Sequence, residues 1–533
     1  MKDSIKFHKN TGIVDLNETF PDNKRLWGSE YQPIPESKRT WGYLSYIGTW
    51  STALNVSPFV LAGSAVALGL PLMDGFIITI LASLFLYFLL VVQSHAGTKY
   101  GMAEPQLTRS RFGIYGAYFA SLSRAVVAIG WFAIQTYIFT EIGLGFYYVY
   151  TGNTAKLASV ASLGPTAMYH ANPTLFILVF ATVLLLQTAL VYFSKISNSQ
   201  ASIRRVFKIN LPIAILGVAI FFIVIMSKIK WNIGSLSSVH IPLAAGFTIP
   251  LILLLFANTV LAAWVTASMN MPDLTRYAKS QKVQMLSQAL LIPINIVAFT
   301  FGIIVTLASV KIFGTMIYDP VVMTTLVAIP FYVKYMILAL FMYMTYTVNI
   351  QGNLIPPAYD IANVFPGKIK FKYGLLLAVG ASLLLQSWIL YGNAESLLES
   401  WESTYAAVLA SIIGVVVCDY LFVRKLNFNP SEVFKSHGYF TYYKGINPAA
   451  FIAIGISLFL IFFPFPWHTI MLYGSGYFAV LITMPIYYLL MRFWIGPKYQ
   501  PDLFNREQTK PISSNKADRK TKSPTEERVS ERE

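Results

Sequence analysis

Four side chains that can bind a planar molecule lie in pairs, four residues apart, within long apolar stretches of the sequence. Trp131 and Gln135 form one pair, and Asn349 and Asn353 form the other. Residues four apart lie on one face of an α-helix. An indole can stack on a planar ring, while amides donate and accept hydrogen bonds in its plane. The pairs favour a site for a planar heterocycle, although Asn and Gln also hold membrane helices together.

Two further segments combine polar or aromatic residues with signs of an irregular helix. Residues 51–58 include Asn55 and end in Pro58, which removes a backbone donor. Residues 258–272 include the pair Ala263 and Trp264 and end in Asn-Met-Pro. Irregular backbone at membrane depth is tolerated only where it lines protein or a cavity, so we expect both segments to line an internal site. Two ordinary helix kinks are the alternative.

Acidic residues are rare within the apolar stretches. Glu141 lies inside the third stretch, together with Arg124. A carboxyl group at this depth is costly and often functional, so Glu141 is a candidate for proton coupling. The sequence contains no zincin, P-loop, dinucleotide-binding or nucleophile-elbow motif in a convincing context, so we expect no enzymatic activity.

The composition requires a bilayer around these residues. The 533 residues are 55% apolar and 12% charged, with a mean hydropathy of +0.56. A spanning helix needs about 20 apolar residues, and the sequence predicts an all-α integral membrane protein with about twelve transmembrane helices. The net charge of +16 lies in connections and tails, which argues against a nucleic-acid-binding face. The expected spans are 45–70, 74–95, 116–147, 173–193, 207–227, 243–270, 286–310, 322–350, 373–392, 402–423, 448–466 and 469–492.

The basic residues predict the orientation of the chain. Lys and Arg gather in the even-numbered connections and are sparse in the odd-numbered ones. Such residues stay in the cytoplasm, so both termini are expected there. We expect a cytoplasmic N-terminal tail at 1–43 and a disordered cytoplasmic tail at 494–533. The single cysteine, Cys418, excludes an intrachain disulfide and a Cys-based metal cluster.

Several sequence fragments, in this order and spacing, resemble the nucleobase-cation-symport-1 family. Its members include cytosine, uracil, allantoin and hydantoin permeases and carriers of thiamine or pyridoxine. The resemblance covers nearly all of residues 20–500. The fragments are KRTW at 38–41, SRFGIYG at 110–116, GWFAIQ at 130–135, AW at 263–264, NMPDLTRY at 270–277, GNLIPPAY at 352–359 and DYLFVRK at 419–425.

The resemblance implies a leucine-transporter-like fold that works by alternating access. Two inverted five-helix repeats would comprise residues 44–228 and 229–425, and two C-terminal helices would follow at 426–493. The pair of irregular segments, five spans apart, agrees with this arrangement. The resemblance also implies roles for six residues. The ring would lie between Trp131 and Trp264, its edge would bond Gln135, Asn353 and Asn55, and the backbone around Ala263 would face it.

A cation site is implied as well. Sodium-coupled relatives use backbone carbonyls that correspond to Ser51, Leu54 and Met344, and two adjacent hydroxyls of the eighth span. Thr347 retains one hydroxyl, but Val348 stands in place of the other. Hard cations prefer oxygen ligands, and valine supplies none from its side chain. We therefore favour coupling to protons over coupling to sodium, while a water ligand would keep sodium coupling open.

The sequence thus predicts a symporter that takes up a nucleobase, allantoin or hydantoin-like heterocycle, coupled to H+ or Na+ and without another cofactor. We expect a multi-pass protein of the cell membrane that acts as a monomer in lipid. A carrier of the same fold for thiamine, pyridoxine, a nicotinamide compound or an amino acid is the alternative. An amino-acid carrier would need free backbone amides at the first helix break, which residues 55–58 do not suggest. An enzyme or channel is a remote alternative.

Overall fold

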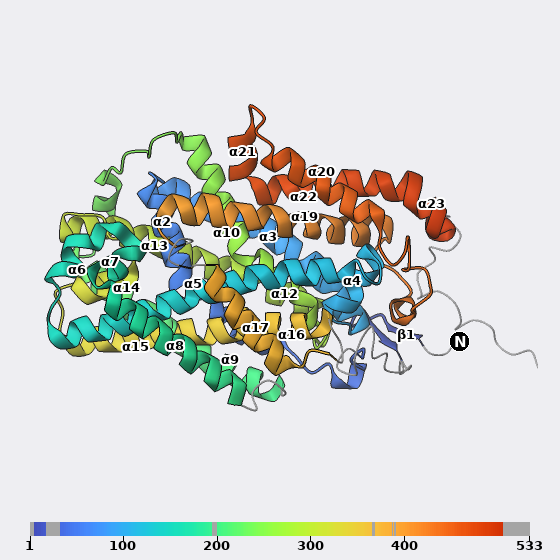
Figure 1. The fold of residues 1–533 in the computed structure, drawn as a ribbon, viewed down its shortest axis with the longest axis horizontal. Helices are drawn as coiled ribbons and strands as arrows, with labels where there is room; N and C mark the ends of the chain where they lie inside the picture. Colours follow the sequence, from blue (N-terminus) through green and yellow to red (C-terminus); the bar gives the residue numbers. More distant parts are fainter. Residues whose placement is uncertain are drawn as a thin grey trace, which may run out of the picture.

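Apolar helices form most of the structure. The computed structural model describes residues 5–16, 32–193, 200–364, 368–385, 387 and 391–504. Within these residues, nine helices are long and apolar enough to cross a membrane, and three shorter apolar helices accompany them. They correspond one by one to the twelve expected spans, and they lie roughly along one another (Figure 1). The boundaries of the two repeats stay a prediction.

The spans have the following bounds. Five of the long spans are single helices: α3 (Leu72–Tyr100), α5 (Ala117–Thr151), α8 (Pro173–Phe193), α9 (Gln200–Lys228) and α10 (Ile249–Met269). Two more are α12 (Gln281–Ala289) followed by α13 (Leu291–Phe313), and α15 (Phe331–Val348) followed by the π-helix η7 (Asn349–Leu354) and α16 (Ile355–Val364). The last two are the π-helix η8 (Ser396–Ser403) followed by α19 (Thr404–Cys418) and the π-helix η9 (Asp419–Val423), and α22 (Ser475–Leu490) followed by the π-helix η11 (Met491–Ile495) and α23 (Gly496–Tyr499). The shorter ones are α2 (Val56–Ala67), α17 (Phe371–Leu384) and α20 (Pro448–Phe462).

The remaining elements form the first half of the first span or lie at the ends of the spans. They are β1 (Ile5–His8), β2 (Ile13–Leu16), η2 (Glu36–Lys38), α1 (Tyr43–Trp50), η3 (Ser51–Ala53), α4 (Glu104–Phe112), α6 (Ala155–Val160), η4 (Ala161–Thr166), α7 (Ala167–Ala171), η6 (Ile233–Ser238), α11 (Met271–Thr275), α14 (Pro320–Leu326), η10 (Pro430–Phe434), α21 (His468–Tyr473) and η12 (Pro501–Phe504).

The first span is broken, as the sequence predicts. The helix α1 ends at Trp50, a 3-10 turn follows, and Asn55 adopts an extended conformation before α2 begins. The side chain of Asn55 accepts a hydrogen bond from the backbone N–H of Ser57 at 2.9 Å. An Asn at this position satisfies an unpaired donor of the first turn and so fixes the start of the new helix. Pro58 lies in that first turn, where its missing N–H costs no helical bond.

The sixth span is less irregular than its sequence suggests. The helix α10 runs without interruption from Ile249 to Met269, and the break comes only at Asn270, where α11 begins. The expected irregularity is therefore confined to the end of the span. Asn258 lies within the helix and joins it to its neighbours, since its side chain accepts from the N–H of Gly476 at 2.8 Å.

The eighth span begins later than predicted. Asp319 caps the separate short helix α14, and an extended stretch up to Pro330 precedes α15. The expected start at residue 322 is thus wrong, because a proline-terminated turn interrupts the apolar run there. At its other end the span passes through the π-helix η7 into α16.

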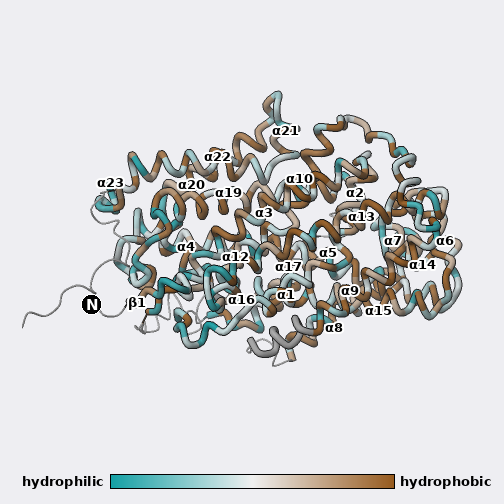
Figure 2. Tube along the Cα trace, turned by 180° about the vertical axis from the view of Figure 1, so that it is seen from behind, coloured by the Kyte–Doolittle hydropathy of each residue, from teal (hydrophilic) through white to brown (hydrophobic). Residues whose placement is uncertain are grey.

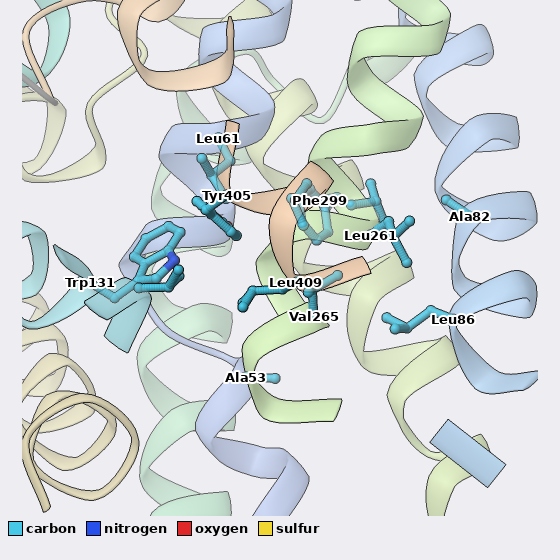
Figure 3. Packing of buried hydrophobic residues seen from close by; sticks show 14 of the residues in the cluster. Ala53, Leu61, Ala82, Leu86, Trp131, Leu261, Val265, Phe299, Tyr405 and Leu409 are labelled. Atoms are coloured by element: carbon cyan, nitrogen blue, oxygen red, sulfur yellow. The ribbon is translucent and has the colours of Figure 1, made fainter. Parts of the chain in front are cut away.

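Buried side chains from four spans form the middle of the core. Leu61 of α2, Leu261 and Val265 of α10, Phe299 of α13 and Leu409 of α19 lie together in Figure 3, and all are buried. Outward-facing helices instead expose large apolar side chains, which suits contact with lipid. Figure 2 shows hydrophobic residues through the middle of the spans and hydrophilic ones gathered near β1, α4 and α23.

The N-terminal tail is joined to the ends of the spans. The strands β1 and β2 pair in an antiparallel hairpin. Arg39 donates to the carbonyl oxygen of Val14 in this hairpin at 2.9 Å and to that of Thr98 in α3 at 2.9 Å. The backbone N–H of Gln281, at the start of α12, donates to the carbonyl of Thr11 at 2.9 Å. Arg39 therefore holds the tail against the end of α3.

The expected disorder from residue 494 onwards is wrong for residues 494–504. These residues form the end of η11, then α23 and η12. Gln500 donates to the carbonyl of Tyr439 at 2.8 Å, and Arg492 lies 4.7 Å from the ring centre of Phe504. Specific contacts therefore order a polar segment that composition alone marked as unfolded. Residues 505–533 lie outside the described residues.

Candidate substrate and cation sites

The break in the first span meets the third span at Gln135. Its amide nitrogen donates to the hydroxyl of Ser57 at 2.5 Å and lies 3.5 Å from the side-chain oxygen of Asn55. The three side chains are buried. The carbonyl oxygen of Gln135 has no hydrogen-bond partner among the described residues. The structure thus brings Asn55 and Gln135 together and leaves one buried acceptor for a donor group of a ligand.

Trp131 lies one turn before Gln135 on α5, as predicted from the spacing. Its ring is 9% exposed and meets Tyr405 edge-on, with ring centroids 6.3 Å apart. Figure 3 shows the indole beside Tyr405. Tyr405 also packs against Trp401 at 5.1 Å. An aromatic cluster from the tenth span therefore covers one side of Trp131.

Trp264 is partly buried on α10 and packs edge-on against Trp50 of α1 at 6.0 Å. Its indole N–H has no hydrogen-bond partner among the described residues. Within those residues no ring contact joins Trp264 to Trp131, and each indole contacts a different aromatic residue. The ring sandwich implied by the family resemblance stays a prediction.

Ala263 precedes Trp264 in the uninterrupted helix. It is partly buried, and its peptide groups lie within the regular hydrogen bonding of α10. A helical backbone has no free donor or acceptor in mid-helix. The structure therefore gives no free backbone group at Ala263, and a contact of this residue with the substrate stays a prediction.

Asn349 and Asn353 have different surroundings, although they belong to the same π-helix. Asn349 is fully buried and donates to the side-chain oxygen of Gln187 in α8 at 2.9 Å and to the hydroxyl of Thr136 in α5 at 3.2 Å. Asn353 is only partly buried, and its amide lies 3.4 Å from the oxygen of Asn349. Asn349 thus connects three helices, while Asn353 retains hydrogen-bonding capacity. In the sequence, a glutamine at position 187 within an apolar stretch is the feature that could have indicated this network.

The residues implied as a cation site do meet, together with one that sequence reasoning missed. The hydroxyl of Thr347 lies 3.0 Å from the carbonyl oxygen of Met344 and 3.0 Å from the side-chain oxygen of Asn210 in α9. The amide of Asn210 donates to the hydroxyl of Ser51 at 3.1 Å. The backbone N–H of Leu54 donates to the carbonyl of Ser51 at 3.2 Å. In the sequence, an asparagine within the apolar stretch of the fifth span is the feature that could have indicated Asn210.

Asn210 adds side-chain hydrogen bonds to the residues implied as a cation site. Its amide N–H donates to the side-chain hydroxyl of Ser51, whereas the resemblance assigns the backbone carbonyl of Ser51 to the cation. The described residues contain no group of three or more His, Cys, Asp or Glu side chains that could hold a metal ion. Side-chain hydrogen bonds of Asn210 join the first, fifth and eighth spans, and the identity of the coupling ion stays a prediction.

Buried acids lie elsewhere in the structure, among them Glu141, Asp319 and Glu402. Glu141 is fully buried on α5, about a turn and a half beyond Gln135, and its carboxyl group interacts with that of Asp319. Glu402 is fully buried in η8 and accepts from the hydroxyl of Tyr405 at 3.5 Å. Sequence reasoning selected Glu141 and missed Asp319 and Glu402, because neither lies in the middle of an expected span.

Comparison with known proteins identifies the chain. Residues 33–480 match the family described as permeases for cytosine and purines, uracil, thiamine and allantoin. The chain belongs to this family. The resemblance inferred from the sequence fragments is therefore confirmed, and the protein is a permease and not an enzyme.

Two curated relatives of this permease match over most of their length. It is 29% identical over 496 residues to the allantoin permease of Bacillus subtilis strain 168, which covers 90% of this chain and 96% of the relative. It is 30% identical over 443 residues to a purine-uracil permease of Arabidopsis thaliana, covering 80% of this chain and 70% of the relative.

Solved structures establish the fold of this permease. A nucleobase-cation-symport-1 family transporter in a closed conformation with bromovinylhydantoin bound matches with a TM-score of 0.69 and 18% identity, over 90% of this chain and 98% of that one. A Na+-coupled sialic acid symporter in an outward-open state matches with a TM-score of 0.56 and 14% identity, over 86% and 90%. The expected all-α, leucine-transporter-like membrane fold is confirmed.

Proposed function

We propose that this permease takes up an allantoin- or uracil-like heterocycle across the cell membrane by alternating access, with both termini in the cytoplasm and the monomer as the functional unit. The names of the relatives, an allantoin permease and a purine-uracil permease, support this substrate class. The observation that carries it is the buried, unpaired carbonyl oxygen of Gln135, one turn from the indole of Trp131.

The proposed binding mode follows from the groups at the site. A heterocyclic ring stacks on Trp131 and Trp264, while its N–H groups donate to the free oxygen of Gln135. The partly buried amide of Asn353 donates to a ring carbonyl. A stacked ring and each hydrogen bond are worth about 1 kcal/mol net, so several together give binding in the micromolar range.

Tryptophan fluorescence of the purified permease tests this proposal. The protein is titrated in detergent with allantoin, uracil, cytosine, adenine, hypoxanthine, benzylhydantoin, thiamine and pyridoxine. Saturable quenching by allantoin or uracil is expected, and it should be lost in Trp131→Ala and in Trp264→Ala. Trp231→Phe, which removes an exposed indole, is the matched control and should keep the response.

The other outcomes decide between related functions. Quenching only by thiamine or pyridoxine would replace the substrate class with a vitamin. No response to any compound in folded protein would contradict the heterocycle site and direct attention to amino acids. Acceleration of labelled-substrate entry by unlabelled substrate on the far side, in proteoliposomes, would distinguish a carrier from a channel.

A further inference from the structure

Two buried carboxyl groups from different elements lie close enough to interact, outside the candidate substrate site. Glu141 of α5 and Asp319, the cap of α14, are both 0% exposed. One oxygen of Asp319 accepts from the backbone N–H groups of Val321 at 2.7 Å and Val322 at 3.0 Å. The carboxyl group of Glu141 interacts with that of Asp319. One oxygen of Asp319 therefore caps α14, and the second oxygen remains near Glu141.

These acids lack the partners that buried carboxylates normally have. Both oxygens of Glu141 and the second oxygen of Asp319 accept no hydrogen bond from any described residue. Neither acid belongs to an ion pair within those residues. Two ionised carboxylates cannot bond each other, whereas one proton between them provides a donor and removes the repulsion. The geometry is that of two acids that share a proton.

Buried tyrosines complete the surroundings of the pair. The hydroxyls of Tyr137 and Tyr391 have no hydrogen-bond partner among the described residues, and their side chains are 0% and 1% exposed. Both lie in the electrostatic field of the two acids. They are buried, unpartnered hydroxyls that interact electrostatically with the acids, and a tyrosine hydroxyl can donate to a carboxylate. The other titratable or charged groups on the packed elements are Tyr318, Tyr169 of α7, the exposed His170 and Lys334 of α15. Tyr169 interacts with Tyr137, and Lys334 donates to the carbonyl of Thr325.

The pair lies where two parts of the permease meet. Tyr318 packs against α2, since a Cβ atom on Gly63 would lie 2.8 Å from the Cβ atom of Tyr318. Asp319 is therefore fixed relative to α2, the helix that Asn55 caps. Glu141 belongs to the helix that carries Trp131 and Gln135. A proton between the acids thus connects α5 to the start of α14, beside α2.

We propose that Glu141 and Asp319 form a proton-sharing carboxyl pair that binds the coupling proton of this permease. The proposal rests on the proposed uptake function for its role in transport. With the proton bound, a hydrogen bond from one carboxyl to the other holds α5 against α14. When the proton leaves to water, two negative charges remain in a buried site, and their repulsion favours separation of the two elements.

The charge state of Asp319 supports this reading. Burial raises its pKa from the usual value of 3.8 to about 6, despite its backbone hydrogen bonds. Under the topology predicted from the basic residues, the connection that contains Asp319 lies outside the cytoplasm. The pair would then lie toward the outer side of the membrane, which suits uptake driven by an inward proton gradient.

Infrared difference spectroscopy of the purified permease tests proton binding without any substrate. Spectra are taken between about pH 5 and about pH 8, where a perturbed carboxyl group titrates. We expect a protonated-carboxyl band that disappears in Glu141→Gln and in Asp319→Asn. Asp319→Asn retains an oxygen acceptor for the cap. Glu395→Gln, at an exposed acid, is the matched control and should retain the band. An unchanged band in both pair variants would overturn the proposal.

Transport in proteoliposomes tests the coupling. The readout is the ratio of labelled allantoin or uracil uptake with and without an inward proton gradient. We expect the ratio to exceed one in the wild type and in Glu395→Gln, and to fall to one in Glu141→Gln. A ratio that stays at the wild-type value in Glu141→Gln would contradict the coupling role. If neither probe enters through the wild type, the proposed substrate class fails, and the infrared result still decides whether the pair binds a proton.

Discussion

The side-chain amide of Asn210 donates a hydrogen bond to the hydroxyl of Ser51 across 3.1 Å. The oxygen of the same amide accepts from Thr347 at 3.0 Å, so one side chain of α9 joins the first and eighth spans. These spans are the ones that the family resemblance assigns to a sodium ion. A hydrogen-bonded amide at this position makes the connection without a cation.

The first prediction concerns sodium. Because Asn210 satisfies Ser51 and Thr347, we expect the affinity of the wild type for its heterocycle to stay within about twofold when sodium is replaced by choline. Fluorescence titration in the two salts measures this. An affinity gain of about tenfold or more in sodium, equal to about 1.4 kcal/mol, would show that the cation binds and would contradict the interpretation.

The second prediction concerns the same amide and stability. Asn210→Ala removes two hydrogen bonds, one to Ser51 and one from Thr347, and leaves these hydroxyls only the backbone carbonyls of Gly48 and Met344 as partners. We expect a loss of about 1–3 kcal/mol, seen as a lower unfolding temperature in detergent. In a double-mutant cycle with Thr347→Val, the second change should cost less in the Asn210→Ala background. Additive losses would show that the two side chains do not interact.

The third prediction separates binding from structure on the eighth span. Asn349→Ala removes hydrogen bonds to Gln187 and Thr136, so it should lower the unfolding temperature. Asn353→Ala should change stability little and weaken heterocycle binding about tenfold, which corresponds to the loss of one hydrogen bond. Thermal unfolding and fluorescence titration of both variants test the contrast. The reverse pattern would assign the ligand contact to Asn349.

The fourth prediction concerns the close approach of α5 to the tenth span. A Cβ atom on Gly130 would overlap the indole of Trp401, so Gly130→Ala should displace the ring that packs on Tyr405. Tyr405 in turn contacts Trp131, and we therefore expect weaker heterocycle binding and a loss of about 1–3 kcal/mol in stability. Gly143→Ala on the same helix is the control, since its nearest neighbour is the Val179 methyl at 3.3 Å. Equal effects of both variants would rule out a specific role for Trp401.

The fifth prediction gives the pH dependence of stability. Because burial raises the pKa of Asp319 from 3.8 to about 6, the folded protein holds this proton more tightly than the unfolded chain does. The resulting stabilisation is complete below about pH 4 and is lost as the pH rises to about 6. The unfolding temperature of the wild type should fall across this window more steeply than that of Asp319→Asn. Parallel curves would show that Asp319 is not responsible.

Spacing and composition predicted much of this architecture. The apolar runs located twelve spans, and Asn55 before Pro58 predicted the break in the first one. The four-residue spacing of Trp131 and Gln135 placed both on one face of a helix. Each of these inferences depends on local geometry, which one stretch of sequence determines.

Contacts between distant spans could not be predicted in the same way. Asn210 and Ser51 are 159 residues apart, and Glu141 and Asp319 belong to elements whose approach depends on the packed fold. Apolar residues around Trp264 allow either a continuous or an interrupted helix, and the pattern alone did not decide between them. The polar segment 494–504 is ordered only because Tyr439 and other distant groups meet it.

The π-helix from Asn349 to Leu354 has a consequence for insertion and deletion. Its hydrogen bonds close over five residues where an α-helix closes over four, so it stores one additional residue within the span. Deleting one residue there would regularise the helix and restore the connection, whereas in a regular helix the same deletion would turn everything beyond it by about 100°. We therefore expect the eighth span to tolerate a one-residue deletion within this π-helix, which carries Asn353. In a homologous sequence with a one-residue gap at this point, we expect a span of similar length in which the residue aligned with Asn353 points in another direction.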